Sequence, residues 1–213
     1  MKKKEQLFIK YLELALCLII ITSCNKEIPE PAREEAPQNN TGFGEKAEVE
    51  TEHYIGELYG GGIVFYVDES KKHGLIVSLQ YLSKAATFSN ILNAEVGAQA
   101  RNMTNGKNNT EAIVQQQGHL NSAARLCMDY KGGGYQDWYL PSLNELLKCQ
   151  EQRLVVYPIL LNTPGADPLS SGFEWSSSEV NAEATWGLSC STMMGPLRIL
   201  KYAEIKVRAV RAF

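Results

Sequence analysis

The side chains that could perform chemistry lie scattered along this sequence. Three histidines, His53, His73 and His119, are far apart in the chain, and their spacing matches no metal-binding pattern. Residues 187–191, GLSCS, lack the final glycine that a serine-hydrolase nucleophile elbow requires. The pattern therefore predicts no metal centre, no cofactor and no serine-based catalytic site.

Three glutamates, Glu174, Glu179 and Glu183, are close enough in the chain to pair for general acid–base catalysis. We interpret them instead as carboxylates that are solvated or bind turns. Arg208 and Arg211 alternate with apolar residues near the chain end, and we interpret them as charges along a strand. A glycosaminoglycan-binding patch is the alternative for the arginines. The sequence thus favours a non-catalytic protein, with an enzyme as the alternative.

Three cysteines of the C-terminal part, Cys127, Cys149 and Cys190, leave one thiol unpaired whichever bond forms. In an oxidising envelope one disulfide could form, but three pairings are open and the sequence does not choose among them. Their spacing matches no zinc site. The alternative is that each cysteine is a buried thiol that serves as a small apolar side chain.

A further cysteine, Cys24, stands at the junction between an apolar run and a polar segment. Residues 2–10 include four lysines, and residues 14–21 are all apolar. Spanning a membrane takes about 20 apolar residues, so this run is too short. A basic leader, a short apolar run and small residues before a cleavage site are typical of a secretory signal peptide.

The stretch ITSC, residues 21–24, resembles the lipobox of bacterial lipoproteins, whose cysteine receives a diacylglycerol and an N-acyl group such as palmitate. Two or more acyl chains are needed for stable attachment to a membrane. The resemblance implies that residues 1–23 are a signal peptide and that lipid at Cys24 anchors the mature chain. Asn25 follows the cysteine, where aspartate would be the usual signal for retention in the inner membrane. We therefore expect the cell outer membrane, and the sequence leaves its leaflet open.

Residues 24–52 predict a tether between the lipid and a folded domain. After Cys24 the segment carries eight Glu against three Lys or Arg and has few apolar residues. Low hydrophobicity with net negative charge is typical of disordered chain. Acidic composition also favours exposure on the external leaflet.

Residues 53–213 are long enough for one domain with a core. They contain equal numbers of acidic and basic side chains, which argues against nucleic-acid binding, since that requires a basic face. Alternating apolar residues predict a hairpin of strands at 63–67 and 75–79, and further strands at 182–190 and 205–213. In the third of these, Trp186 should face the core and Thr185 the solvent.

Helical periodicity predicts helices between these strands. One begins near Asn108, a second presents Leu120, Ala123, Ala124 and Cys127 on one face, and a third begins at the capping box of Ser142 and Glu145. Trp138 and Trp175 are interpreted as core residues rather than a sugar platform. Strands flanking central helices without βαβ alternation define an α+β class.

Five ordered blocks carry a resemblance over about residues 56–213: GGGIVFYVDESKKHGLIVS, GKNNTEAIV, AARLCMDYKGGGYQDWYLPSLNELLKC, EWSSSE and VRAVRAF. They resemble the bacterial domain-of-unknown-function family called the Lcl C-terminal domain, named after a collagen-like surface adhesin. The resemblance implies a single C-type-lectin-like domain in which paired terminal strands lie beside two helices and a small second sheet. The calcium-binding loop motifs of calcium-dependent lectins are absent, so no calcium site is expected.

The stretch YLPSLNELLKC is also similar to a block of the formylglycine-generating family, a related scaffold. Those enzymes use a pair of C-terminal cysteines, and only Cys190 lies in that part of this chain. Their active site therefore does not carry over.

Lectin-like scaffolds bind partners through irregular segments, because loops vary without disturbing a core. The irregular segments expected here are 162–171 and 192–198. The second holds Met193, Met194 and Arg198, which we predict to bind a glycan or a surface protein, since flexible thioethers suit an adaptable contact surface. The alternative is that both methionines pack beneath a loop. The predicted function is binding or adhesion by a lipid-anchored envelope protein, with an enzyme or a purely structural envelope protein as alternatives.

Overall fold

The computed structural model of the chain describes residues 51–213. These residues belong to one compact unit, Glu48–Phe213. The predicted signal peptide, the lipidation site Cys24 and nearly all of the predicted tether lie outside the described residues. Within the described part, no helix is long and apolar enough to cross a membrane.

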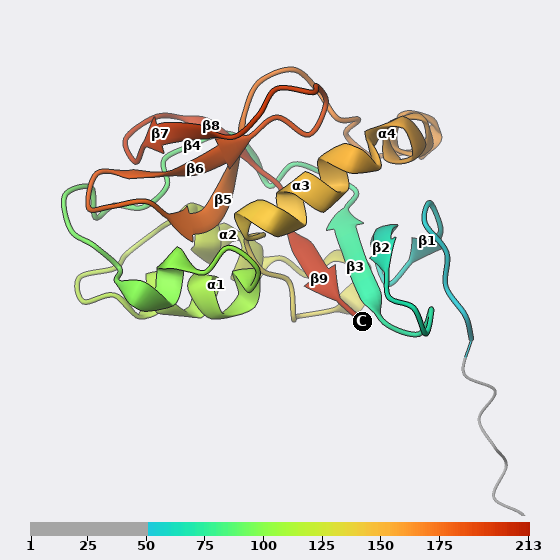
Figure 1. Cartoon of the computed structure of the whole chain (residues 1–213), viewed down its shortest axis with the longest axis horizontal. Helices are drawn as coiled ribbons and strands as arrows, with labels where there is room; N and C mark the ends of the chain where they lie inside the picture. The colour runs from blue at the N-terminus through green and yellow to red at the C-terminus, as the bar shows by residue number, and fades with distance from the viewer. Residues whose placement is uncertain (1–50) are drawn as a thin grey trace, which may run out of the picture. The chain divides into compact units, whose positions relative to one another are not determined.

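The first sheet has four antiparallel strands in the order β1-β2-β3-β9. Their bounds are Leu58–Tyr59 for β1, Gly62–Val67 for β2, Gly74–Ser78 for β3 and Val210–Ala212 for β9. The predicted hairpin is confirmed as β2 and β3, whose residues 62–67 and 74–78 pair in antiparallel register. The last strand of the chain, β9, returns to lie beside β3 (Figure 1).

The second sheet has the order β4-β8-β5-β6-β7. Its strands are β4 (Ser83–Ala86), β5 (Glu174–Glu179), β6 (Ala184–Leu188), β7 (Leu197–Leu200) and β8 (Ile205–Val207). Strands β5 and β8 pair in parallel, and the other neighbours are antiparallel.

The single strand predicted at 205–213 is wrong, because the chain changes sheets within it. Residues 205–207 pair in the second sheet as β8, and residues 210–212 pair in the first as β9. Arg208 and Ala209 make the crossing, and their contacts to Ser78 explain it. The Arg208 guanidinium donates to the Ser78 carbonyl at 2.7 Å, and the Ala209 amide donates to the Ser78 hydroxyl at 3.2 Å.

Four α-helices lie between the strands. They are α1 (Gly106–Gln115), α2 (Ala123–Asp129), α3 (Leu143–Glu151) and α4 (Arg153–Asn162), with short 3-10 turns at Ala98–Arg101 and Gly132–Gly134. Helix α3 contacts β2 of the first sheet and β5 and β6 of the second, and Figure 1 shows it crossing between them. Helix α1 contacts α2 and β5, and α2 contacts β8.

Side-chain caps set where the helices begin. The Ser142–Glu145 capping box at the start of α3 is confirmed, with both reciprocal hydrogen bonds present. The start predicted at Asn108 is wrong, because the Asn105 side chain accepts from the Asn108 amide and caps α1 earlier. Ser122 caps α2 in the same way, so Leu120 lies before the helix and is exposed.

Helix α4 was not predicted, and the reason is its composition. Its residues RLVVYPILLN are apolar on most sides and contain Pro158, so no 3.6-residue periodicity marks it. Residues 51–213 therefore contain one α-helix more than the three that periodicity predicts and two more than the resemblance implies.

The core forms two clusters of buried side chains. One surrounds α3 and includes Phe65, Leu143, Leu146 and Leu188, and the other includes Phe88, Trp138 and Trp175. The interpretation of both tryptophans as core residues is confirmed. The mixture of helices with two sheets also confirms the α+β class.

The facing predicted for strand β6 is wrong. Thr185 is fully buried and its hydroxyl donates to the Ser178 carbonyl at 2.8 Å, while Trp186 is only partly buried. Because β6 is covered on both faces, alternation of polar and apolar residues did not separate core from solvent.

Candidate functional site

Met193, Met194 and Arg198 lie at the open edge of the second sheet. Strand β7 is last in the strand order and, among the described residues, pairs only with β6. The methionine side chains are 70% and 53% exposed, so the alternative that both pack beneath a loop is wrong. Arg198 is also exposed but belongs to β7, opposite Trp186, rather than to a loop as predicted.

A buried glutamine of α3 is hydrogen-bonded to the segment before β7. The Gln150 side-chain amide donates to the Ser189 carbonyl at 2.9 Å and to the Met194 carbonyl at 2.8 Å. These hydrogen bonds use the backbone of Met194 and leave its thioether in solvent. The methionines are therefore presented outward from a fixed backbone.

The segment after β7 is fixed by a buried cation. Lys201 is 1% exposed, and its ammonium group donates to the Glu179 carboxylate at 2.7 Å and to the Ala94 carbonyl at 2.9 Å. The Lys201 amide also donates to the Glu183 carbonyl at 2.9 Å. Buried polar contacts thus anchor both ends of the exposed strand.

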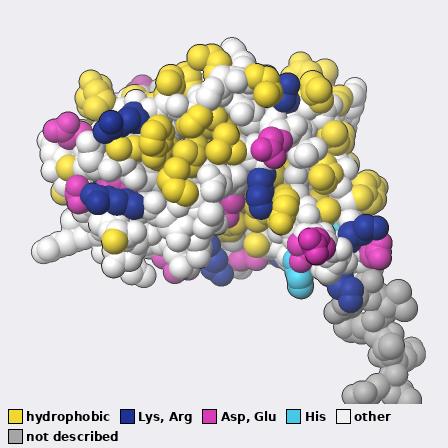
Figure 2. Space-filling model, viewed as in Figure 1, with side chains coloured by type: hydrophobic (Ala, Val, Ile, Leu, Met, Phe, Trp, Pro, Cys, Tyr) yellow, Lys and Arg dark blue, Asp and Glu magenta, His cyan; other side chains and the backbone are white. Residues whose placement is uncertain are grey.

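The exposed side chains around β7 are mostly apolar. We call them the β7 surface and define it as Met193, Met194, Leu197, Arg198, Leu200 and Tyr202, all exposed. Large apolar side chains exposed together at a sheet edge are typical of an interaction site rather than of an ordinary surface. Figure 2 shows hydrophobic side chains gathered over β6 and the start of α3, and again over α4.

A pocket lies between α4 and the segment that leads to Met193. Its volume is about 370 Å³, and its lining residues are Arg153, Leu154, Tyr157, Pro158, Leu169 and Ser191. Ser191 is two residues before Met193, so the pocket adjoins the β7 surface through the chain. An aliphatic and aromatic lining with one guanidinium fits an apolar side chain that has a polar end.

A second pocket, of about 400 Å³, lies against α1 and is lined mainly by amide-bearing side chains. The lining residues are Ala98, Gln99, Asn102, Asn108, Glu111, Ala112 and Gln115. No pattern in the sequence indicates a site at these residues. The polar side chains come from the 3-10 turn and from α1, so only the fold brings them together.

The interpretation of the three glutamates as solvated or turn-binding carboxylates is wrong for Glu174 alone. Glu174 and Glu179 are 1% and 2% exposed, while Glu183 is exposed. Glu179 does bind a turn as predicted, since its carboxylate accepts from the amides of Val96 and Gly97. Both buried carboxylates have structural partners, because the Tyr81 hydroxyl donates to Glu174 at 3.0 Å.

The interpretation of Arg208 as a strand charge is also wrong, because this side chain is 1% exposed. Its guanidinium donates to the carbonyls of Ser78 and Asp167 and stacks 3.9 Å from the Tyr81 ring centre. Burial is the main cause that raises the pKa of Tyr81 to about 12, and the Glu174 carboxylate adds to it. The Arg211 side chain is 11% exposed and pairs with the more exposed Asp137 at 2.5 Å.

The fold brings together two of the histidines that are distant in sequence. His53 and His73 line one pocket of about 320 Å³ with Thr51, Glu57, Tyr59 and Lys72. The His53 amide donates to the Lys71 carbonyl at 2.8 Å, which places the hairpin turn beside it. His53 pairs with Glu57 at 2.9 Å and packs against Tyr59 and Phe213. In residues 51–213 no three His, Cys, Asp or Glu side chains gather to hold a metal.

Comparison with known proteins adds little to this geometry. No protein-family model matches the sequence, and no curated protein matches it. Among solved structures, a fimbrial protein from Bacteroides ovatus ATCC 8483 is similar, with a TM-score of 0.49 and 16% identity. That match covers 64% of this chain and 35% of the other, so the chain spans about a third of the matched protein. Similarity of this degree assigns neither family nor function.

Proposed function

We propose that the chain is a lipoprotein of the cell outer membrane, anchored by lipid at Cys24, whose domain binds a partner without catalysing a reaction. The β7 surface carries this proposal. It places Met193 and Met194, 70% and 53% exposed, at an unpaired strand edge whose two ends are fixed by buried hydrogen bonds. A rigid support beneath adaptable thioethers is a favourable arrangement for recognition.

A protein partner fits the β7 surface better than a glycan does. An open strand edge offers backbone amides and carbonyls to an added strand, and the neighbouring apolar pocket offers space for its side chains. Charged side chains on this surface are few, so burial of apolar area would supply most of the affinity. Arg198 then contributes orientation through its guanidinium.

A glycan is the second candidate, and the amide-lined pocket at α1 favours it. Side chains such as Gln99, Asn108 and Gln115 can donate to and accept from sugar hydroxyl groups. No calcium ion is part of this proposal, in agreement with the missing lectin loop motifs.

The finer fold description also belongs to this proposal. A C-type-lectin-like arrangement, as the resemblance to the Lcl C-terminal family implies, is supported by the pairing of β9 with β3 of the N-terminal hairpin. The adjacent second sheet and the crossing helix α3 fit the same description.

The test is to apply soluble chain 48–213 both to a glycan array and to immobilised outer-membrane proteins of the same cells, with and without a calcium chelator. We expect chelator-independent binding to a defined protein. Binding to glycans that is lost on substitution of Asn108 and Gln115 would select the α1 pocket instead. Absence of binding to either class would leave a structural envelope protein and contradict the proposal.

A further inference from the structure

Two of the three cysteines in the described residues lie in the same part of the core. Cys149 and Cys190 belong to the cluster around α3, whereas Cys127 belongs to the cluster that contains Trp138 and Trp175. All three are at most 1% exposed and carry free thiols. The fold therefore separates Cys127 from the other two.

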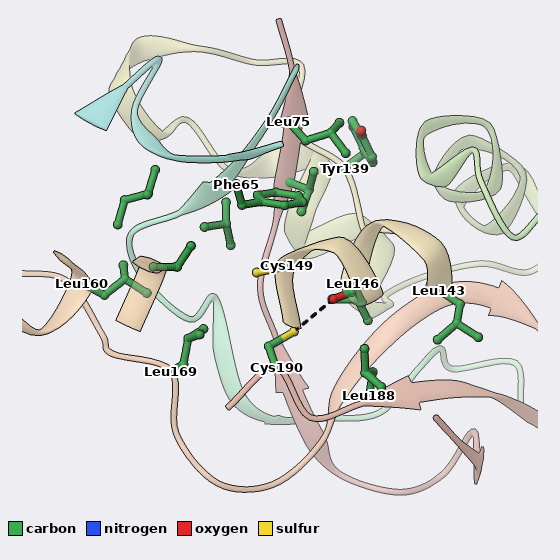
Figure 3. Packing of buried hydrophobic residues seen from close by; sticks show 14 residues of the cluster. Phe65, Leu75, Tyr139, Leu143, Leu146, Cys149, Leu160, Leu169, Leu188 and Cys190 are labelled. Carbon is green, nitrogen blue, oxygen red and sulfur yellow. Dashed lines mark hydrogen bonds between the residues drawn. The ribbon is translucent and has the colours of Figure 1, made fainter. Parts of the chain in front are cut away.

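Cys149 and Cys190 are neighbours in the fold, although their positions in the sequence differ by 41. Cys149 lies on the last turns of α3, and Cys190 follows β6 by two residues. The Cys190 thiol points at this helix, because its sulfur lies 3.8 Å from the carbonyl oxygen of Leu146, which precedes Cys149 by one helical turn. The two thiols lie close enough to interact, and Figure 3 shows both sulfur atoms beside α3.

We propose that Cys149 and Cys190 form a disulfide bond when the chain folds in an oxidising compartment, and that Cys127 stays reduced. In the reaction two S–H bonds are lost and one S–S bond forms. The two electrons pass to a disulfide oxidant, either a thiol–disulfide exchange protein or oxidised glutathione, which becomes two thiols. The two protons released from the cysteines balance those thiols.

The order of events follows from burial. The attacking species is a thiolate, and the neighbouring Cys149 thiol, together with burial, raises the pKa of Cys190 well above its ordinary value. Glu174, which is also buried beside this thiol, raises it further through its negative charge. The bond therefore forms while the chain is folding, before the cluster closes, and thiols that are buried in the reduced form resist later oxidation.

The disulfide would restrain the backbone of the segment that contains Met193 and Met194. Cys190 lies between Ser189 and Met194, the residues whose carbonyls accept from Gln150. Gln150 directly follows Cys149, so the covalent and the hydrogen-bonded links would join adjacent residues of α3 to the same segment. In the cell, formation of the disulfide depends on the export that is part of the proposed function. Its formation in vitro does not depend on that export.

The experiment unfolds the purified full chain under reducing conditions and refolds it in oxidised glutathione. Remaining thiols are then alkylated in denaturant. Trypsin separates the cysteines, because Cys127 falls in peptide 126–131, Cys149 in 149–153 and Cys190 in 154–198. We expect peptide 149–153 to be linked to 154–198, two hydrogen atoms lighter than their sum, and peptide 126–131 to be alkylated.

Matched serine variants sharpen the test. In Cys190→Ser the linked peptides should disappear and a reductant should no longer lower the thermal midpoint of the refolded protein. In Cys127→Ser both the linkage and the effect of reductant should persist. Alkylation of both Cys149 and Cys190 in refolded wild-type protein, or a linkage of either one to a different cysteine, would overturn the proposal. Failure to bind a partner would leave these masses unchanged, so the two proposals fail separately.

Discussion

Lys201 and Glu179 form an ion pair that is almost fully shielded from solvent, with side-chain exposures of 1% and 0% and a separation of 2.7 Å. Removing one member of a buried pair leaves the other charge uncompensated, which costs about 3–5 kcal/mol. Glu179 would keep its two backbone amide donors but no cation. We therefore expect Lys201→Met to lower the free energy of unfolding by about 3–5 kcal/mol, measured by urea denaturation.

A solvent-exposed pair supplies the control. Lys84 lies 3.0 Å from Asp167 with 72% of its side chain exposed, and exposed pairs contribute about 0–1 kcal/mol. Lys84→Met should therefore change the free energy of unfolding by less than about 1 kcal/mol. Equal effects of the two lysine substitutions would show that Lys201 is not buried against Glu179.

Two glycine-rich turns illustrate how distant elements depend on each other. A Cβ atom at Gly61, which has φ +85°, would lie 2.6 Å from the Gly132 carbonyl oxygen and 2.8 Å from the Gly133 Cα atom. Backbone atoms are unable to rotate away as a side chain does. The glycine runs at 60–62 and 132–134 thus pack directly against each other.

Gly61→Ala tests this contact, and Gly134→Ala is its matched control. Gly134 also has a positive φ, +83°, but nothing lies within 4 Å of an added Cβ. The control should cost about 1–2 kcal/mol, the penalty for a left-handed alanine. Gly61→Ala should cost a further 1–3 kcal/mol, roughly the range for overpacking. Equal denaturation midpoints for the two variants would contradict the contact between the turns.

The cap of helix α3 introduces a pH dependence. Burial raises the pKa of Glu145 above its ordinary 4.5, although hydrogen bonds from Ser142 and Tyr139 oppose the shift. An acid whose pKa is raised on folding binds more protons in the folded state, so stability is lost as pH rises above about 4.5. Asp68 and Asp167 have lowered pKa values and affect stability only at lower pH, below about 3.8.

Glu145→Gln should remove this dependence while keeping an acceptor for the capping box. We expect the variant to gain stability relative to wild type as pH rises from about 4.5 towards 7, in urea titrations at fixed ionic strength. A constant difference between the two proteins across this range would show that Glu145 has the same pKa in both states.

Local patterns in the sequence predicted the elements whose form depends on neighbouring residues. The β2–β3 hairpin and the Ser142–Glu145 capping box are of this kind. Burial of Thr185 and Glu179 was not predictable in the same way, because it depends on which strands and turns meet across the fold. Arg208 is an example. A guanidinium among alternating apolar residues indicates a surface strand, and only the fold shows that the carbonyls of Ser78 and Asp167 accept its hydrogen bonds.

The candidate site likewise has features that the residue types indicate and features that depend on tertiary contacts. The segment around Met193 and Met194 was predictable from residue type alone, because the flexibility of a thioether does not depend on tertiary structure. The Gln150 hydrogen bonds join segments that are far apart in sequence, because Gln150 lies 39 residues from Ser189 and 44 residues from Met194. The pocket beside α4 likewise requires Ser191 to meet the helix. The amide-lined pocket is built from residues 98–115 alone, and its form depends on how the 3-10 turn packs against α1.

At the scale of the whole molecule, Cys24 is the proposed link to the membrane. Cys24→Ala should block lipid attachment, so the chain should remain unprocessed and move from the detergent phase to the aqueous phase on partitioning. Proteolysis of intact cells expressing the unmodified chain would then identify the leaflet. An unchanged mass and unchanged partitioning of the variant would contradict attachment at this cysteine.

The central claim is that the β7 surface binds the partner of this domain, and an affinity measurement tests it most directly. The double variant Met194→Ala/Arg198→Ala should bind the partner identified by the wild-type chain at least about tenfold more weakly, equivalent to about 1.4 kcal/mol. Its thermal midpoint should stay unchanged, because both side chains are exposed. Leu120→Ala, which removes an apolar side chain that is 79% exposed and lies outside the β7 surface, should bind as the wild type does. Wild-type affinity in the folded double variant would contradict the claim.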